Sequence, residues 1–124
     1  MTREMKIPGL DHPITIEPSS DRVTVRAGGA ILADSTNTLV LREANYPPVR
    51  YIPFADVDQT LLTPSDTSTY CPYKGEASYW SIDTDSEGGE DAVWFYDQPY
   101  AAVESIRDHV AFYADRVEIA IQES

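Results

Sequence analysis

The sequence predicts a small, mostly β domain, built as an antiparallel two-sheet or open-barrel arrangement with one short helix. Apolar and polar residues alternate with a period of two in several short runs, which is the pattern of half-buried strands. Turn signals that contain Gly and Pro separate these runs. Long stretches with the 3.6-residue helical period are almost absent, and a chain of 124 residues is expected to form one domain.

Four short strands are predicted in the first third of the chain. Val23 and Val25 alternate with polar residues, so they lie on one face of a strand. The pair Gly28 and Gly29 follows and predicts a tight hairpin turn. The next strand then runs back beside the first, and another continues the meander after a polar turn. The predicted strands are residues 14–17, 22–26, 30–33 and 39–41.

The middle of the chain is rich in proline and aromatic residues. Pro47 and Pro48 cannot donate hydrogen bonds to a neighbouring strand, so residues 46–53 are predicted to form an ordered connector or a sheet edge. Further elements are predicted on the carboxyl-terminal side of this segment. They are a helical turn at 55–58, a short strand at 61–63 and a loop at 67–74.

A hairpin is predicted around an acidic tip. Residues 77–82 and 92–96 have the composition of strands, and the Gly-rich segment 84–91 joins them. The carboxylates of this tip do not have the spacing of the twelve-residue calcium loop found in EF-hands. The tip is therefore predicted to be a solvated loop.

The carboxyl-terminal part contains the expected helix and a final hairpin. The helix is predicted near residues 101–107, and the hairpin pairs 110–113 with 117–121. Residues 1–11 show no regular pattern and are predicted to be a flexible amino-terminal segment. Residues 12–124 then form the single β-rich domain.

The negative net charge of the chain limits the partners that it can bind. Nine Lys and Arg face 21 Asp and Glu, which gives a formal net charge of −12. Nucleic acid and anionic membrane surfaces are repelled at long range by such a charge, so neither is an expected partner. A local basic pocket is still compatible with this charge, and a small anionic ligand stays possible. The chain is expected to be a monomer or a homodimer.

Cys71 is the only cysteine. It cannot form an intramolecular disulfide, and no cysteine-rich zinc site can be assembled, so no metal and no cofactor are expected. The first ten residues lack the apolar run of a signal peptide, and no stretch approaches the length of a membrane span. These features predict a cytoplasmic protein.

Two strings of the sequence resemble a known family. They are residues 41–53, with the sequence LREANYPPVRYIP, and residues 69–80, with the sequence TYCPYKGEASYW. Together with the tail VAFY at 110–113, they resemble the domain of unknown function family 427. The likeness extends from about His12 to Ile121.

The resemblance implies a small, mostly β, cytoplasmic protein of bacteria or fungi with no established activity. It implies a shape similar to the β-tent domains, which often hold a structural zinc, but this chain has no cysteine pairs to bind one. The family also carries a nucleotidyltransferase-like label.

Nucleotidyl transfer needs metal ions held by close carboxylates. Asp56 with Asp58 and Asp83 with Asp85 have a suitable spacing of two residues. The sequence lacks the Gly-Ser turn and the phosphate loop that this chemistry needs, and Asp56 is expected to cap a helical turn instead. Nucleotidyl transfer is therefore not the expected activity.

The two strings of the resemblance carry the candidate site. Lysine and arginine beside aromatic rings would form a local cationic pocket, which suits a small anionic or planar ligand through charge-assisted hydrogen bonds and stacking. The predicted ligand-binding residues are Arg42, Glu43, Tyr46, Arg50, Tyr51, Cys71, Tyr73, Lys74 and Trp80.

Structural alternatives exist for several of these residues. Trp80 and Trp94 lie on predicted strands, where aromatic side chains usually belong to the core or to cross-strand pairs. Arg42 and Glu43 could form an internal ion pair, and Cys71 could be a small buried apolar residue.

Two other functions are compatible with the sequence. An enzyme would use Cys71 as a nucleophile or Lys74 as a base, with Glu43 carrying the proton. Nothing in the spacing supports a pairing of Cys71 with His12 or His109, and no catalytic residue is assigned. A protein-interaction domain would meet its partner through residues 46–53.

Overall fold

The computed structural model describes residues 3–83 and 88–124, and it contains ten strands and three short 3₁₀ helices in those ranges. The strands are β1 (Ile14–Pro18), β2 (Arg22–Ala27), β3 (Ala30–Ser35), β4 (Leu39–Glu43), β5 (Val49–Pro53), β6 (Leu62–Cys71), β7 (Gly75–Ile82), β8 (Val93–Phe95), β9 (His109–Phe112) and β10 (Glu118–Gln122). The helices are η1 (Phe54–Asp56), η2 (Gln59–Leu61) and η3 (Ala101–Ile106). The predicted mostly β class is confirmed.

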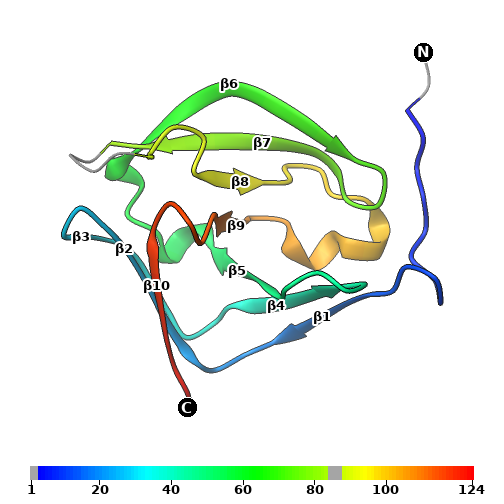
Figure 1. The fold of residues 1–124 in the computed structure, drawn as a ribbon, viewed down its shortest axis with the longest axis horizontal. Helices are drawn as coiled ribbons and strands as arrows, with labels where there is room; N and C mark the ends of the chain where they lie inside the picture. Colours follow the sequence, from blue (N-terminus) through cyan, green and yellow to red (C-terminus); the bar gives the residue numbers. More distant parts are fainter. Residues whose placement is uncertain (1–2, 84–87) are drawn as a thin grey trace.

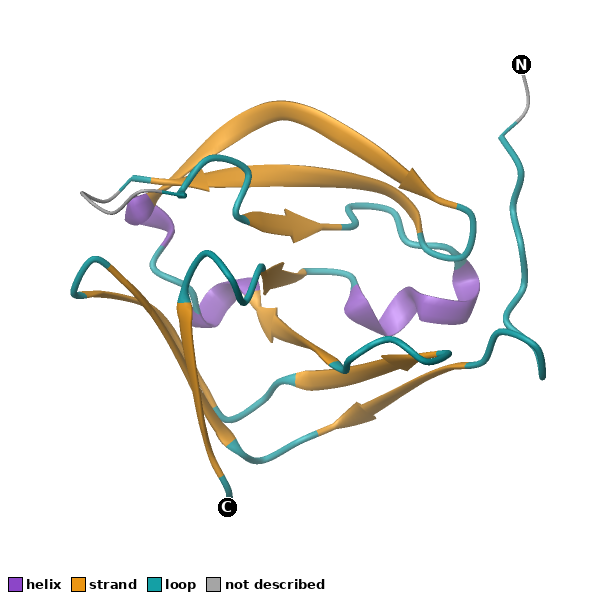
Figure 2. Ribbon diagram, in the orientation of Figure 1, coloured by secondary structure: helices purple, strands orange, loops and turns teal. Residues whose placement is uncertain are grey.

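The strands form two antiparallel sheets (Figure 1). Seven strands make the large sheet in the order β1-β4-β5-β9-β8-β7-β6, and three make the small sheet in the order β10-β2-β3. The large sheet curls, so that β6 and β7 lie above β1 and β4, with η3 at one end of the space between them (Figure 2). Strands β1 and β6 stay unpaired with each other among the described residues, and the sheet is open.

Two pairings differ from the prediction. The last strand, β10, pairs with β2 in the small sheet, while β9 pairs with β5 and β8 in the large one, so the predicted final hairpin is wrong. Val110, Ala111 and Phe112 in β9 are all buried and take two strand neighbours. The meander of the first third also stops at β3, because β4 pairs with β1 and β5.

The predicted connector at 46–53 is a strand in its second half. Strand β5 lies inside the large sheet between β4 and β9. Pro47 and Pro48 stay outside the ladder in the β4–β5 turn, which removes the hydrogen-bonding conflict that predicted an edge. Tyr51 and Ile52 are both 1% exposed, so they are among the most buried residues of the protein.

The predicted loop at 67–74 is largely strand as well. Strand β6 runs for ten residues and forms an edge of the large sheet. Its register with β7 shifts between Pro64 and Ser68, which is where a proline on an edge strand is tolerated. The predicted hairpin of 77–82 with 92–96 is confirmed by the pairing of β7 with β8.

The structure has helices near both predicted positions, but their type and bounds differ from the prediction. The helix expected near 101–107 is the 3₁₀ helix η3, and the turn expected at 55–58 begins one residue earlier as η1. Asp56 does not cap a helix, and instead its side chain accepts a hydrogen bond of 2.6 Å from the Ser35 hydroxyl. Asp58 is the capping residue, because its side chain accepts from the backbone amide of Thr60 at the start of η2.

Two clusters of buried side chains stabilise the fold. The first lies between the sheets and includes Val23 and Val25 from β2 and Ile52 from β5. The second includes Val103 and Ile106, through which η3 packs on the large sheet. No helix in residues 3–83 or 88–124 is long and apolar enough to cross a membrane.

Residues 3–11 run beside the end of the β6–β7 hairpin. The backbone amide of Lys6 donates to the carbonyl of Pro72 at 2.8 Å, and the guanidinium of Arg3 lies 4.7 Å from the centre of the Tyr70 ring. The Tyr70 hydroxyl is 2.6 Å from that of Tyr100, and this hydrogen bond raises the pKa of Tyr70 to about 12. The flexibility of residues 1–11 stays a prediction.

Candidate functional site

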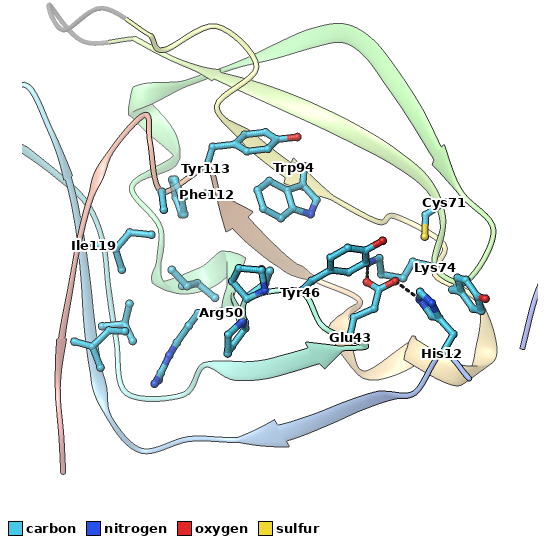
Figure 3. Close-up of a pocket in the computed structure, with 18 of the residues that line it drawn as sticks. His12, Glu43, Tyr46, Arg50, Cys71, Lys74, Trp94, Phe112, Tyr113 and Ile119 are labelled. Carbon is cyan, nitrogen blue, oxygen red and sulfur yellow. Dashed lines mark hydrogen bonds and ion pairs between the residues drawn. The ribbon is translucent and has the colours of Figure 1, made fainter. Parts of the chain in front are cut away.

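A cleft of about 850 Å³ has a polar end and an apolar end (Figure 3). Residues from β4, from the β6–β7 turn and from the segment before β1 form the polar end. Side chains of β2, β5, β9 and β10 line the apolar end between the two sheets. The lining residues are His12, Val23, Glu43, Tyr46, Pro47, Pro48, Val49, Arg50, Ile52, Tyr70, Cys71, Pro72, Tyr73, Lys74, Trp94, Phe112, Tyr113, Ala114, Ile119 and Ile121.

Glu43 is the centre of the polar end. One carboxylate oxygen accepts a hydrogen bond from the Lys74 ammonium, and the other lies 2.8 Å from Nε2 of His12. The Glu43 side chain is 10% exposed and that of Lys74 is 13% exposed. Burial by itself raises the pKa of Glu43, but the hydrogen bonds from Lys74 and His12 outweigh it and hold that pKa below its usual value. Glu43 is therefore a carboxylate at neutral pH.

Strand pairing brings His12 and Glu43 together. Ile14 of β1 lies opposite Glu43 of β4, and the Ala44 amide donates to the carbonyl of Pro13. The segment before β1 is thereby fixed beside the end of β4, where His12 reaches the Glu43 carboxylate.

The β6–β7 turn delivers Lys74 from the other side of the cleft. The Lys74 amide donates to the Cys71 carbonyl, which closes the turn. Gly75 follows with a φ of +110°, a conformation that side chains disfavour, and a Cβ there would lie 3.4 Å from the carbonyl oxygen of Gln98. A residue with a side chain would therefore be strained at this end of the turn.

Aromatic rings line both ends of the cleft. Tyr73 stacks on His12 with ring centres 4.0 Å apart and an angle of 5° between the planes. Trp94 packs on Tyr113 with centres 4.5 Å apart, and its indole Nε1 donates a 3.2 Å hydrogen bond to the Tyr51 hydroxyl. Burial raises the pKa of Tyr51 far above its ordinary value and that of Tyr113 to about 12, so both hydroxyls are neutral at pH 7.

Arg50 also lines the cleft, but its charge is already compensated. Its guanidinium lies 3.3 Å from the Asp21 carboxylate and donates to the hydroxyls of Ser19 and Thr38. A hydrogen bond from the Ser124 backbone amide and the contact with Arg50 both lower the pKa of Asp21. Since Lys74 is paired with Glu43 in the same way, the cleft contains two cations that are each balanced by a carboxylate.

Six of the nine predicted ligand-binding residues line this cleft, namely Glu43, Tyr46, Arg50, Cys71, Tyr73 and Lys74. Tyr51 lies behind the wall, where its hydroxyl contacts Trp94.

Arg42 and Trp80 do not share the cleft, which corrects the prediction that they converge with Lys74. Successive side chains of a strand point to opposite faces, so Arg42 is exposed beside the buried Glu43, and Trp80 lines a separate hollow. The alternative of an internal ion pair holds for Glu43, which pairs with Lys74, whereas Arg42 makes no ion pair with it among the described residues.

Sequence reasoning missed His12, Trp94 and Tyr113 as lining residues, and it missed the whole apolar end. His12 reaches the cleft because β1 pairs with β4. The alternation in the sequence predicted hairpins between successive strands instead, so it gave no sign of this position. Trp94 was expected in the core, and it both packs against the second buried cluster and faces the cleft. Cys71 is half-buried and combines the same two roles.

Three of the four carboxylates whose spacing was considered for metal-dependent transfer, Asp56, Asp58 and Asp83, have other roles. Asp58 caps η2, and Asp83 accepts a hydrogen bond from the Thr63 hydroxyl. Asp85 and the rest of 84–87, part of the predicted acidic tip, lie outside the described residues. In 3–83 and 88–124, no three His, Cys, Asp or Glu residues are grouped closely enough to hold a metal ion.

The segment predicted to meet a protein partner is exposed only at its start. Tyr46 is 63% exposed, and Pro47 and Pro48 are exposed beside it, whereas Tyr51 and Ile52 are buried in the large sheet. A partner would therefore meet mainly the β4–β5 turn, because Tyr51 and Ile52 are not available to it.

A family model described as "Domain of unknown function (DUF427)" matches residues 15–123. The match covers both sheets and all of the cleft apart from His12. No curated protein matches the chain.

Proposed function

The chain belongs to the DUF427 family, and from that premise we propose that it is a binding domain whose cleft holds a small planar ligand. The observation that carries the proposal is the single cleft that joins a buried donor and acceptor at one end to an aromatic and apolar wall at the other. Small-molecule sites have this composition, with an apolar lining and a few placed polar groups.

The polar end favours a ligand with an amide-like edge. The Lys74 ammonium has three N–H donors, of which Glu43 takes one, and the Glu43 carboxylate keeps lone pairs beyond those that meet Lys74 and His12. A neighbouring N–H and C=O on one ring edge would match Glu43 and Lys74 in turn. The planar body of the ligand would then extend along Trp94 and Tyr113.

The charge balance favours a planar ligand over a simple anion. Both cations of the cleft are paired with carboxylates, so a bare anion would have to compete with Glu43 for Lys74 and with Asp21 for Arg50. A planar ligand needs no such exchange. Between the two ligand types that the sequence suggested, the ion pairs support the planar one.

Titration followed by NMR tests this proposal, because the indole N–H of Trp94 lies in the cleft wall. The probe is 2-quinolone, a planar ring with an amide edge, and inorganic phosphate is the anion for comparison. We expect 2-quinolone to shift the Trp94 resonance and phosphate to leave it in place. A Trp94 resonance that moves with phosphate alone, or with neither compound, contradicts the proposal.

Two variants test the polar end. Lys74→Met removes the donor and should weaken 2-quinolone binding about tenfold, which is the loss of one hydrogen bond to a charged group. Arg42→Met removes the same charge from an exposed position of β4 outside the cleft, and should change affinity less than about twofold. Equal effects of the two substitutions would show that Lys74 does not contact the ligand.

An enzyme is the second candidate, and one observation favours it. Glu43 lies between His12 and Lys74 in the cleft that Cys71 also lines, so acid, base and nucleophile types share one space. The test is the rate at which iodoacetamide modifies Cys71 at pH 7. A catalytic thiol should react faster than free cysteine and slow down in Lys74→Met, whereas a rate at or below that of free cysteine excludes the cysteine mechanism.

A further inference from the structure

A second hollow, of about 570 Å³, shares no lining residue with the cleft. We call it the aromatic hollow, because Phe54, Trp80 and Phe95 form a row of rings along it. The centres of Phe54 and Trp80 are 5.7 Å apart with 22° between the planes, and those of Trp80 and Phe95 are 5.9 Å apart with 30° between the planes. All three rings are half-buried, so each keeps some surface that a ligand can cover.

Two carboxylates stand at the same hollow. Asp97 and Asp108 both line it, and both are exposed. Within the described residues neither makes an ion pair or a side-chain hydrogen bond. Asp108 has a φ of +63°, and its carbonyl accepts a 2.9 Å hydrogen bond from the Phe54 amide, which ties it to the first ring of the row.

Two further polar side chains, His109 and Gln59, line the hollow. Nδ1 of His109 lies 2.7 Å from the carbonyl oxygen of Arg107. A carbonyl only accepts, so Nδ1 carries the hydrogen in this contact. The amide nitrogen of Gln59 donates to the Phe54 carbonyl, which leaves its oxygen to accept. Among residues 3–83 and 88–124, no lysine or arginine lines the hollow.

We propose that the aromatic hollow binds a small organic ammonium ion. Ring faces attract cations through their quadrupole, and carboxylates beside them add a charge-assisted hydrogen bond for each N–H. The hollow combines three rings with two carboxylates, and no lysine or arginine in the described part of the chain lines it. The net charge of −12 adds an attractive field for any cation.

A primary ammonium group fits better than a quaternary one. The carboxylates of Asp97 and Asp108 can each accept an N–H hydrogen bond, which a quaternary ammonium cannot donate. The body of the ligand should be flat or apolar, because it has to cover the rings of Phe54, Trp80 and Phe95. An anionic ligand is disfavoured, since the same carboxylates would repel it.

The two tryptophans make the test specific. Trp80 lies in the aromatic hollow and Trp94 in the cleft, so their indole N–H resonances report on the two sites separately. The probe is 2-phenylethylammonium, whose amine is protonated at pH 7 as that of lysine is. The controls have the same ring with a neutral or negative end, as 2-phenylethanol and 3-phenylpropionate. A Trp80→Phe variant assigns the resonance.

We expect 2-phenylethylammonium to shift the Trp80 resonance in a saturable way, and the two controls to give no saturable shift. Equal binding of the alcohol would overturn the proposal, because the rings alone would then account for it. A response confined to Trp94 would also overturn it, while leaving the proposed function of the cleft untouched. Failure of 2-quinolone at Trp94 would in turn leave the aromatic hollow untouched.

A pair of double variants tests the carboxylates. Asp97→Asn with Asp108→Asn removes both charges, and asparagine tolerates the positive φ at Asp108. Affinity for 2-phenylethylammonium should fall about fivefold, the effect of two partly exposed ion pairs. Asp11→Asn with Asp66→Asn takes the same charge from exposed positions outside the hollow and should change affinity less than about twofold. Equal losses in the two double variants would overturn the proposal.

Discussion

Replacing Glu43 by glutamine should destabilise the protein more than any other single removal of a carboxylate charge in the β-sheets. The side chain is 10% exposed and receives contacts from Lys74 and His12, which are 13% and 21% exposed. A glutamine keeps one acceptor but leaves the Lys74 ammonium without a counter-charge in a nearly buried position. We expect the free energy of unfolding to fall by about 2 kcal/mol, because breaking a buried pair costs roughly 3–5 kcal/mol and the open cleft lets water reduce that cost.

Urea denaturation at pH 7 measures this effect, with Glu17→Gln as the matched control. Glu17 is an exposed residue of the neighbouring strand β1, and its substitution removes the same charge. The control should change the free energy of unfolding by less than about 0.5 kcal/mol. If the two substitutions have equal effects, Glu43 does not hold a buried ion pair and the described polar end of the cleft is wrong.

A double variant separates the two causes of the loss. In Glu43→Gln with Lys74→Met, the unpaired ammonium is gone as well. The double variant should therefore be about 1 kcal/mol more stable than Glu43→Gln alone. A loss equal to the sum of the two single losses would show that the side chains act independently.

Three further predictions concern pH and packing. The pKa of Glu43 is lowered from 4.5, so the difference in unfolding free energy between wild type and Glu43→Gln should be complete above pH 4.5 and should shrink as the pH falls through the lowered pKa. Urea denaturation at pH 7 and at about pH 3 tests this, and a difference that stays constant between the two pH values contradicts it. Ile106→Ala should cost about 3 kcal/mol by urea denaturation, since Ile106 is 0% exposed, whereas Ile121→Ala at a 50% exposed site should cost less than about 1 kcal/mol; equal losses would contradict the described core. Gly89→Ala would place a Cβ 2.5 Å from the Ile82 carbonyl oxygen and should lower the melting temperature clearly, while Gly29→Asn, with open space and a φ of +82°, should not; the reverse order would contradict the described turns.

The strands could be predicted from the sequence because alternation is a local property. Val23 and Val25 in β2 have this signal, and so does the hairpin of β7 and β8. Strand pairing is not local, and the prediction joined neighbours along the chain where the fold joins β1 to β4 and β10 to β2. The alternation of β10 is the same in either pairing, so it could not choose between them.

Part of the candidate site was predictable for a different reason. Glu43 and Lys74 belong to the two strings that resemble the family, and both line the cleft. What the sequence could not supply was the partner of each charge, because the ion pairs of Lys74 with Glu43 and Arg50 with Asp21 join distant segments. For that reason, the pocket that was expected to be cationic has each of its two cations paired with a carboxylate. Trp80 was wrongly assigned to the cleft. It packs against the first buried cluster, whereas its neighbour Tyr79, on the opposite face of β7, belongs to the second.

A crystal structure of the protein soaked with 2-quinolone tests the central claim most directly. We predict that the amide edge of the ligand lies between the Glu43 carboxylate and the Lys74 ammonium, with its rings against Trp94 and Tyr113. Density for the ligand elsewhere on the protein, or a cleft in which Glu43 and Lys74 lie apart, would contradict the proposal.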